Sequence, residues 1–478
     1  MEMQSRPKSP NLESQTPIPQ AGSQVPKSKT QVSPARGKSQ STGSGPAGGE
    51  GAKLVSAFSV CYGIFFGICL LKFGNPPIME RWVTAPKDLF ELVFGYPWPI
   101  SWAYTGLAAL GIFGLVAGRW SKTSGSWLIW VLLAWWVWQV VATARSVDDS
   151  LSTSTLKHLT ANVVCFVLGF FALSRSKNLW PFWAGIFSAL LLVIWSGWGQ
   201  HFGGLEETRE YFMKNVYPTL REVPLEYLKK LSSGRIFATF FYPNALAGGI
   251  LLLLPPTLAL LWHTERFTRP ARLFLMAAIA GGCFACLFWS GSKGGWLLML
   301  VLGVLAVLRL SLQPKYKAAI IVAVLVVGCA GFLARHLIFF QKGATSVSAR
   351  FDYWQAAVRI ARQHPITGTG PGTFFIPYQA IKKPESEPSR LVHNDYLEQA
   401  SDSGFPGLVL YSVFAFGSIL TVIRRKDLRT DWVVFCVGLG VLGFFLQEFM
   451  EFSMYIPSLA WLTFALLGWL VGREHWDS

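Results

Sequence analysis

The sequence predicts an all-α integral membrane protein with about twelve transmembrane helices. Two observations predict this class. Of the 478 residues, 52% are hydrophobic and only 14% are charged, and the apolar residues gather in separate runs. A run of about 20 apolar residues can cross the hydrocarbon layer as a helix, which satisfies its own backbone hydrogen bonds. The expected spans are 54–71, 98–118, 126–143, 158–174, 180–198, 245–262, 272–289, 295–310, 317–334, 405–423, 431–449 and 455–472.

The basic residues between these spans orient the chain, because Lys and Arg are enriched in short cytoplasmic loops. The loops expected inside the cell contain Arg119 and Lys122; Arg175 and Lys177; Arg266, Arg269 and Arg272; Lys315 and Lys317; and Arg424, Arg425, Lys426 and Arg429. The other side holds two long connections, 199–244 and 335–404. Both termini are therefore expected in the cytoplasm, with the two long loops facing outward.

Four segments follow from this pattern. Residues 1–52 are rich in Ser, Pro, Gly and Lys and nearly free of aromatics, so we expect a disordered cytoplasmic tail. Residues 53–478 form the polytopic membrane domain. The first external loop, 199–244, has a loose helical period that predicts short amphipathic helices. The large loop between predicted helices 9 and 10, 335–404, carries a helix-like stretch, "SARFDYWQAAVRIARQHP", and then the turn-rich "ITGTGPGTF". It is expected to be an ordered, partly helical lid.

Composition also argues against several functions. The net charge of +16 is spread over short loops and the tail, which does not favour nucleic-acid binding. Cys283 and Cys286 have metal-type spacing but sit in an apolar span without polar partners, so no metal and no cofactor is expected. The many tryptophans, such as Trp135, Trp136 and Trp138, are expected to face lipid or the membrane interface.

Polar residues gather at the outer ends of the spans and not at the middle of the membrane. The candidates are Arg235, Asn244, Lys293, Arg350, His393, Asn394, Glu448 and Glu451. Several fixed cations at a membrane surface suit a lipid diphosphate and can stabilise it as it departs. A neutral histidine can take a proton from an attacking hydroxyl. Together these residue types predict transfer of a group from a lipid diphosphate to an alcohol.

Each candidate also has a purely structural interpretation. Arg350 could anchor the start of a helix, Arg235 could snorkel to the interface, and Lys293 could be a topological charge. His393 could cap the following helix. Glu448 and Glu451 suit counter-charges for the arginines, a second base or simple interfacial residues. The glycines of "GTGPG", residues 368–372, favour a tight turn over a phosphate cradle, because no strand precedes them.

Three motifs resemble the bacterial O-antigen ligase and O-antigen polymerase family. "SARFDYWQAAVRIARQHPITGTGPGTFFIPY" followed by "HNDYLEQASDSGFPGLVLY" is similar to the large-loop signature of that family. "GRIFATFFYPNALAGG" resembles its Arg and Pro-Asn motif, at Arg235, Pro243 and Asn244. "SGSKGG" resembles its Ser-x-Ser-Arg-Gly turn, with Lys293 where Arg is more usual.

The resemblance implies an inverting, metal-independent glycosyltransferase of the bacterial inner membrane. It implies a donor glycan carried on undecaprenyl diphosphate and an acceptor hydroxyl on a lipid A core, a growing glycan or a protein, at the periplasmic face. By the same resemblance, Arg235, Lys293 and Arg350 hold the diphosphate, and His393 activates the acceptor or orients the donor. The sequence does not separate ligase, polymerase and protein oligosaccharyltransferase.

A different class of function remains open. A polysaccharide or lipid transporter of the flippase type would have a similar number of spans and would move its cargo without chemistry. Transporters usually place ionisable or unwound positions near the middle of the bilayer, where these spans have almost none. The sequence therefore favours the enzyme.

Overall fold

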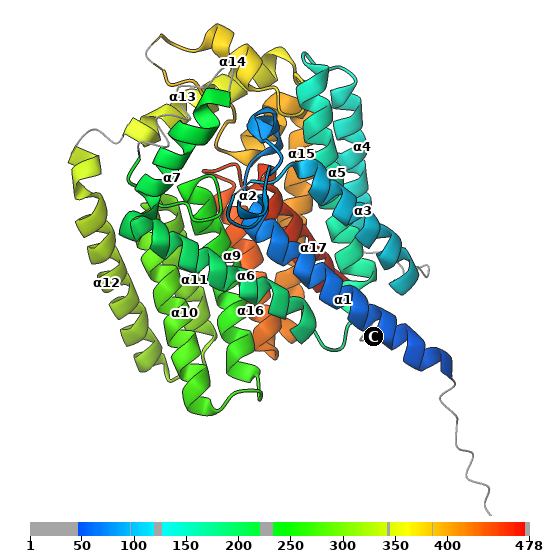
Figure 1. The fold of residues 1–478 in the computed structure, drawn as a ribbon, viewed down its shortest axis with the longest axis vertical. Helices are drawn as coiled ribbons and strands as arrows, with labels where there is room; N and C mark the ends of the chain where they lie inside the picture. Colours follow the sequence, from blue (N-terminus) through cyan, green and yellow to red (C-terminus); the bar gives the residue numbers. More distant parts are fainter. Residues whose placement is uncertain are drawn as a thin grey trace, which may run out of the picture. The chain divides into compact units, whose positions relative to one another are not determined.

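The computed structural model describes residues 46–95, 97–118, 127–219, 233–341, 345–384 and 386–473. In these ranges every regular element is a helix, apart from an isolated bridge between Gly74 and Phe240. Each predicted span corresponds to one long helix (Figure 1). These helices are α1 (Pro46–Lys72), α3 (Ile100–Ala117), α4 (Trp127–Thr143), α5 (Asp149–Phe171), α6 (Trp180–Gly199), α9 (Pro243–His263), α10 (Arg269–Ser290), α11 (Lys293–Arg309), α12 (Pro314–Gln341), α15 (Asp395–Arg424), α16 (Trp432–Gln447) and α17 (Pro457–Arg473).

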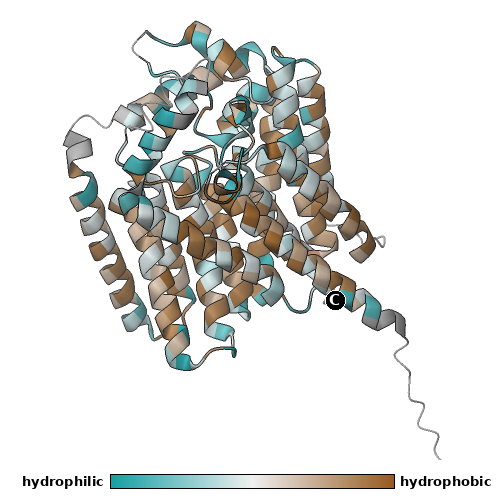
Figure 2. Ribbon diagram, viewed as in Figure 1, coloured by the Kyte–Doolittle hydropathy of each residue, from teal (hydrophilic) through white to brown (hydrophobic). Residues whose placement is uncertain are grey.

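The outer faces of these helices suit lipid and not water. Among the described residues, eight helices are long and apolar enough to cross a membrane, and α4 and α16 are apolar but shorter. Apolar residues cover the helices along their length (Figure 2), and large side chains such as Trp130 and Trp195 are 69% and 78% exposed. So much exposed apolar surface is unfavourable in water. The chain is a multi-pass, all-helical membrane protein.

Small residues allow the closest helix pairs to form. A Cβ atom on Gly63 of α1 would lie 2.2 Å from the carbonyl oxygen of Phe182 on α6. Similarly, a Cβ atom on Gly169 of α5 would lie 2.2 Å from the carbonyl oxygen of Ala465 on α17. In lipid, apolar helices gain little from hydrophobic burial, so close packing between their backbones stabilises helix pairs instead. Helix α17 is buried from Pro457 to Gly472 and forms the centre of this arrangement.

Helix α15 is broken near the start of its predicted span. Ser403 and Gly404 leave helical geometry, and Gly404 has φ +71°. A side chain at Gly404 would strike the backbone of Ile366, which only glycine avoids. The predicted span 405–423 therefore matches the part after the break, and Asp395–Asp402 forms a short, largely buried helical segment before it.

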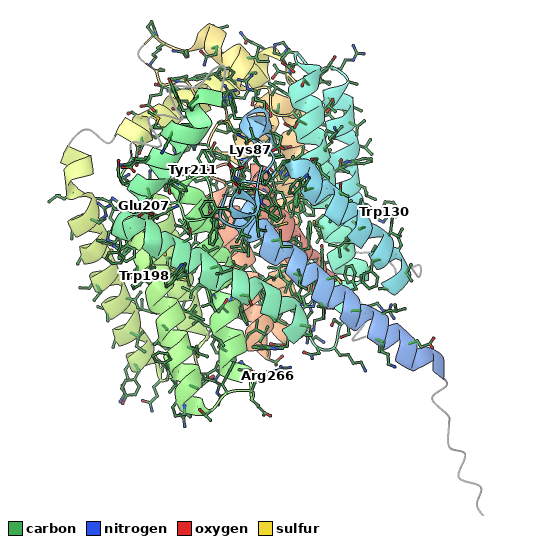
Figure 3. All side chains as sticks on the ribbon, in the orientation of Figure 1. Lys87, Trp130, Trp198, Glu207, Tyr211 and Arg266 are labelled. Carbon is green, nitrogen blue, oxygen red and sulfur yellow. The ribbon has the colours of Figure 1, made fainter. Side chains whose placement is uncertain are left out.

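Both of the long loops that are expected to face outward contain the expected helical segments. The first has a π-helical turn at Gln200–Gly204, α7 at Leu205–Tyr211, a second π-helical turn at Phe212–Val216 and a 3-10 turn at Tyr217–Thr219; its residues 220–232 lie outside the described ranges. The large loop contains α13 (Thr345–Gln363) and α14 (Phe375–Ile381), flanked by longer α12 and α15 than predicted. Figure 3 places Arg266, in the α9–α10 connection, at the opposite end of the bundle from α13 and α14.

Shorter elements complete the described chain. They are the 3-10 turns Pro77–Trp82, Leu173–Arg175, Asp427–Arg429 and Ser453–Tyr455, and α2 (Leu89–Phe94). Helix α1 begins at Pro46, inside the segment expected to be a tail. Residues 1–45 of that expected tail lie outside the described ranges.

The expectation that Trp135, Trp136 and Trp138 face lipid or the interface is wrong for Trp135. The indole of Trp135 is fully buried and donates to Gln399 Oε1 (2.8 Å). Trp136 and Trp138 are partly buried and donate to Thr160 Oγ1 (2.9 Å) and to the carbonyl oxygen of Ser403 (2.8 Å). A buried indole N–H needs an acceptor, and polar groups on α5 and α15 provide it.

The "GTGPG" stretch is a tight turn. Gly368, Gly370 and Gly372 have φ of +63°, +108° and +75°. Side chains there would collide with Asp402, Ser146 and Thr155, so the turn packs against α15 and the ends of α4 and α5. The amide of Gly372 donates to Asp402 Oδ2 (2.6 Å). The turn anchors the large loop to the membrane helices.

Candidate functional site

The predicted cations and histidine meet in one cavity of about 320 Å³. Its lining includes Arg235, Asn244, Lys293, Arg350, His393 and Glu451. They come from separate parts of the chain: the segment before α9, the start of α9, the start of α11, helix α13, the residue pair before α15 and the α16–α17 connection. Three of these elements belong to the two long loops, so the cavity lies where the large loop covers the helix ends.

Glu451 is the central anion of the cavity. Its Oε1 atom accepts hydrogen bonds from Asn244 Nδ2 (2.6 Å) and from Arg350 Nη2, and its Oε2 atom lies 3.2 Å from His393 Nδ1. Burial raises the pKa of this carboxyl group, but the charges of Arg350, His393 and Arg235 outweigh burial and hold the pKa below its usual value. Glu451 is therefore ionised at neutral pH.

Arg235 is held at two points before α9 begins. Its Nε atom donates to the carbonyl oxygen of Ser290 (2.6 Å), and its Nη2 atom donates to Asn244 Oδ1 (2.8 Å). Burial, together with the nearby Arg350 and Arg335, lowers its pKa to about 10 despite the opposite effect of Glu451. These two hydrogen bonds fix the orientation of the guanidinium, which is a charged hydrogen-bond donor.

Arg350 is positioned by the first turns of α13 and by the α16–α17 connection. Its Nε atom donates to the carbonyl oxygen of Met450 (3.0 Å) and its Nη1 atom to that of Ser346 (3.2 Å). With the bond to Glu451, all three guanidinium nitrogens have partners. This bonding ties the large loop to the α16–α17 connection at the cavity.

His393 sits in a strained position at the end of the large loop. Its φ of +55° is uncommon for a residue with a side chain, and such strain persists only where the surroundings fix it. The ring lies between Tyr353 (ring centres 5.9 Å apart) and Phe452 (4.8 Å). A proton on Nδ1 shared with Glu451 leaves Nε2 as the basic nitrogen.

Lys293 begins α11 directly after a left-handed turn. Gly291 has φ +59° and ends α10, and the Ser292 side chain caps α11 by accepting from Gly295 N (3.3 Å). The ammonium lies just before the predicted span 295–310. Burial first, and then the charges of Arg235, Arg350 and Arg335, lower its pKa to about 8.

Two of the predicted supporting residues lie outside the cavity lining. Asn394 caps α15 through Leu397 N (3.0 Å) and donates to the carbonyl oxygen of Phe449 (3.0 Å). Glu448 is fully buried and accepts from the hydroxyl of Tyr411 (2.6 Å). Asn394 thus stabilises the start of α15 next to His393, and Glu448 stabilises the end of α16 close to Glu451.

Sequence reasoning missed the aromatic walls and one further cation. Tyr353 follows Arg350 at the i+3 spacing that places two side chains on one helix face, which is a signal in the sequence. Phe452 and Tyr242, which both line the cavity, meet edge to face with their ring centres 5.0 Å apart. Arg335 near the end of α12 is close enough to lower the pKa of Arg235 and Lys293.

The cavity suits an anionic group beside a proton acceptor. Three cations, Arg235, Lys293 and Arg350, face it together with two carboxylates, Glu451 and Glu387. Glu451 is already engaged with Arg350, Asn244 and His393, and the cluster of cations suits a ligand with phosphate-like oxygens. In the described part of the chain, no three His, Cys, Asp or Glu side chains are arranged to hold a metal ion.

Part of the chain matches a known protein family. The family described as O-antigen ligase matches residues 275–412, from α10 into α15. The matched region contains Lys293, Arg350 and His393, whereas Arg235 and Glu451 lie outside it. No curated protein matches the chain. By this match and by its motifs, this part of the chain is similar to the bacterial O-antigen ligase and O-antigen polymerase family.

Proposed function

We propose that this protein is an inverting glycosyltransferase that moves a glycan from undecaprenyl diphosphate to an acceptor hydroxyl. The match of residues 275–412 to the O-antigen ligase family supports a role in polysaccharide biosynthesis; the donor and the chemistry are the proposal. The observation that carries it is the convergence of Arg235, Lys293, Arg350 and His393 on one cavity with Glu451 at its centre.

The histidine acts as the general base. Nε2 of His393 accepts the proton of the acceptor hydroxyl while the acceptor oxygen attacks the anomeric carbon of the donor sugar. The bond between that carbon and the diphosphate oxygen breaks on the opposite face, so the configuration inverts. The Glu451 carboxylate keeps the ring oriented and stabilises the imidazolium that forms.

The cations stabilise the departing diphosphate. Arg235 and Arg350 are fixed by backbone carbonyls, Ser290 and Met450 respectively, so they need little reorganisation when charge develops on the leaving oxygen. Lys293 adds a point charge at the end of α11. Such preorganised charge serves the role that a metal ion plays in other enzymes, and we propose that the reaction needs none.

The membrane placement is part of the same proposal. About twelve spans, both termini in the cytoplasm and the two long loops in the periplasm place the cavity at the outer face of the bacterial inner membrane. The carrier's diphosphate would then lie at the helix ends, and its acceptor would approach from the periplasm under the large loop.

A reconstituted assay tests the reaction. The purified protein is incubated with a short undecaprenyl diphosphate glycan, EDTA and three acceptors in turn: a lipid A core, a second glycan and an acceptor protein. Released undecaprenyl diphosphate and the product are followed by mass spectrometry. We expect transfer with inverted configuration to one acceptor, which also distinguishes ligase, polymerase and protein oligosaccharyltransferase.

Other outcomes would overturn the proposal. Retained configuration would exclude a direct displacement, and activity that EDTA removes would exclude metal independence. Carrier binding without turnover on any acceptor would favour the transporter, and vesicles containing the protein would then move the lipid-linked glycan between leaflets.

A further inference from the structure

A small pocket of about 170 Å³ lies where α9 ends and α10 begins. It is lined by Trp262, Arg269, Arg272 and Leu273, and we call it the α9–α10 pocket. Helix α10 has 22 residues, so the pocket and the candidate site stand at ends of this helix that are roughly 33 Å apart. Figure 3 shows Arg266, in the same connection, at that far end of the bundle. The arginines of the pocket therefore play no part in the proposed reaction.

One arginine of the pocket is held in place by the protein itself. Arg272 Nη1 donates to the carbonyl oxygens of Trp262 (2.7 Å) and Thr264 (3.0 Å) at the end of α9. A guanidinium has five N–H donors, and in the described part of the chain only those of Nη1 are used. Arg272 is therefore a positioned cation whose Nε and Nη2 donors are available to a ligand.

The second arginine of the pocket has no partner among the described residues. Arg269 stands three residues before Arg272, the spacing that places two side chains on one helix face. Across the described ranges, no ion pair involves Arg266, Arg269 or Arg272. In contrast, Arg425, just after the end of α15, pairs with Asp427. The arginines of the α9–α10 pocket thus keep their charge for something outside the chain.

Aromatic and apolar side chains place this pocket at a membrane interface. Trp262 is 51% exposed, and the guanidinium of Arg266 lies 5.1 Å from the ring centre of Trp180. Tryptophan is enriched at the level of the lipid headgroups. The next residues of α10, Leu273 and Phe274, are 46% and 72% exposed and suit hydrocarbon. Charged donors beside exposed apolar side chains fit an amphiphile with an anionic head.

We infer that the α9–α10 pocket binds the phosphate of an anionic phospholipid between Arg269 and Arg272. The acyl chains lie outside the pocket along Leu273 and Phe274. The pocket is smaller than the roughly 300–1,000 Å³ of sites for drug-sized molecules, so it suits a headgroup alone. Arginine matches phosphate with paired donors, and basic pockets between membrane helices suit anionic headgroups. Glu265, the acidic residue of the connection, lies outside the pocket lining and does not oppose this charge there.

The inference goes beyond the proposed function and does not depend on it. In the orientation proposed above, the bound lipid lies in the cytoplasmic leaflet. A zwitterionic lipid brings its own cation to the headgroup, so the two arginines favour it less. Each basic residue near an anionic lipid surface contributes about 1 kcal/mol, which is about fivefold in affinity. Two arginines therefore predict a preference of about 25-fold for the anionic lipid.

Lipid titrations of the purified full-length protein in detergent test the inference. Native mass spectrometry counts the bound molecules of phosphatidylglycerol, of phosphatidylcholine with the same acyl chains, or of glycerol 3-phosphate. We expect one phosphatidylglycerol per chain to bind about 25-fold more tightly than phosphatidylcholine, and glycerol 3-phosphate to bind much more weakly because it has no acyl chains. Equal affinity for the two lipids would overturn the inference. Glycerol 3-phosphate binding as tightly as phosphatidylglycerol would assign the pocket to a soluble phosphate ester and would also overturn it.

Arg269→Gln removes one pocket charge without removing any contact within the described chain. We expect phosphatidylglycerol to bind this variant about fivefold more weakly, with the Tm in lipid-free detergent unchanged. Arg424→Gln is the matched control, because Arg424 is an exposed arginine at the end of α15 and does not line the pocket. It should bind phosphatidylglycerol as the wild type does. Wild-type binding by Arg269→Gln, or an equal loss in both variants, would overturn the inference.

Arg269→Lys gives a second variant in case Arg269→Gln lowers the Tm. Lysine keeps the charge but lacks the paired donors of guanidinium. We expect its affinity for phosphatidylglycerol to lie between those of the wild type and Arg269→Gln. Affinity as low as that of Arg269→Gln, in a variant with the wild-type Tm, would show that the charge does not bind the lipid and would overturn the inference.

Discussion

Glu451 Oε2 lies 3.2 Å from His393 Nδ1, so a buried carboxylate orients the predicted base of the reaction. The same carboxylate binds Arg350 and Asn244 through its other oxygen. Glu451 thus connects the histidine at the end of the large loop to Arg350, one of the cations that we propose bind the diphosphate. Its function is to position other side chains, because its own oxygens are already occupied.

Replacement of this carboxylate should slow the chemical step. We expect Glu451→Gln to lower kcat about 10- to 100-fold, as for other residues that orient a reactive group through a hydrogen bond. The acid limb of the pH–rate profile should also move to lower pH, since the amide no longer favours the protonated ring. Asp352→Asn on α13 is the matched control, because Asp352 bonds Ser386 outside the cavity lining. A lower kcat with an unmoved profile would make Glu451 merely structural.

His393 carries the proton transfer in the proposed reaction. We expect His393→Ala to lower kcat by about 10² to 10⁴, the usual contribution of a general base, with membrane insertion and donor binding retained. The measurement is single-turnover transfer beside donor binding for the same preparation. Transfer at the wild-type rate would remove His393 from the mechanism and leave its strained backbone unexplained.

Arg350 has a different predicted effect, because it contacts both the diphosphate site and Glu451. Arg350→Ala should abolish transfer and also weaken donor binding, since a charged donor is lost and Glu451 is left without its strongest partner. Arg350→Lys keeps the charge but cannot reach Met450, Ser346 and Glu451 together. We therefore expect partial recovery of binding without full recovery of kcat. Full recovery by Lys would show that charge alone matters.

Much of this fold could be predicted from the sequence, because the hydrocarbon layer imposes run length and apolar composition directly. Every predicted span coincides with a helix, and the large loop contains its expected helix and turn. The orientation of Trp135, Trp136 and Trp138 could not be predicted, since their acceptors on α5 and α15 are distant in sequence. Composition places tryptophan in a membrane, but only tertiary packing decides which partner its N–H finds.

The charged residues of the site could be predicted from the sequence, but the contacts between them could not. Arg235, Lys293, Arg350 and His393 are recognisable as polar residues at the ends of apolar runs. The separation of Glu451 from Glu448 was not, because both stand at the end of the same apolar run in the sequence, whereas α16 ends at Gln447. Only the turn after α16 directs Glu451 into the cavity and leaves Glu448 bonded to Tyr411.

Lys293 should give the enzyme an alkaline limit. With a pKa lowered to about 8 by burial and by the charges of Arg235, Arg350 and Arg335, its ammonium is present below pH 8 and is lost as the pH rises through that value. Donor binding should therefore weaken between about pH 7 and about pH 9. Lys293→Arg should remove this limb, because guanidinium stays charged throughout the range. The same decline in both proteins would assign the limb to another group.

Helix packing gives a prediction that is independent of the reaction. Gly63→Ala should destabilise the protein by about 1–3 kcal/mol, because the added Cβ would lie 2.2 Å from the carbonyl oxygen of Phe182 and force α1 away from α6. Gly111→Ala on α3 is the matched control, since no atom lies within 4 Å of its added Cβ. Alanine also favours the helix over glycine by roughly 0.8–1.0 kcal/mol, so Gly111→Ala should leave the Tm in detergent unchanged or higher. Equal Tm values for the two variants would mean that the close contact between α1 and α6 contributes nothing to stability.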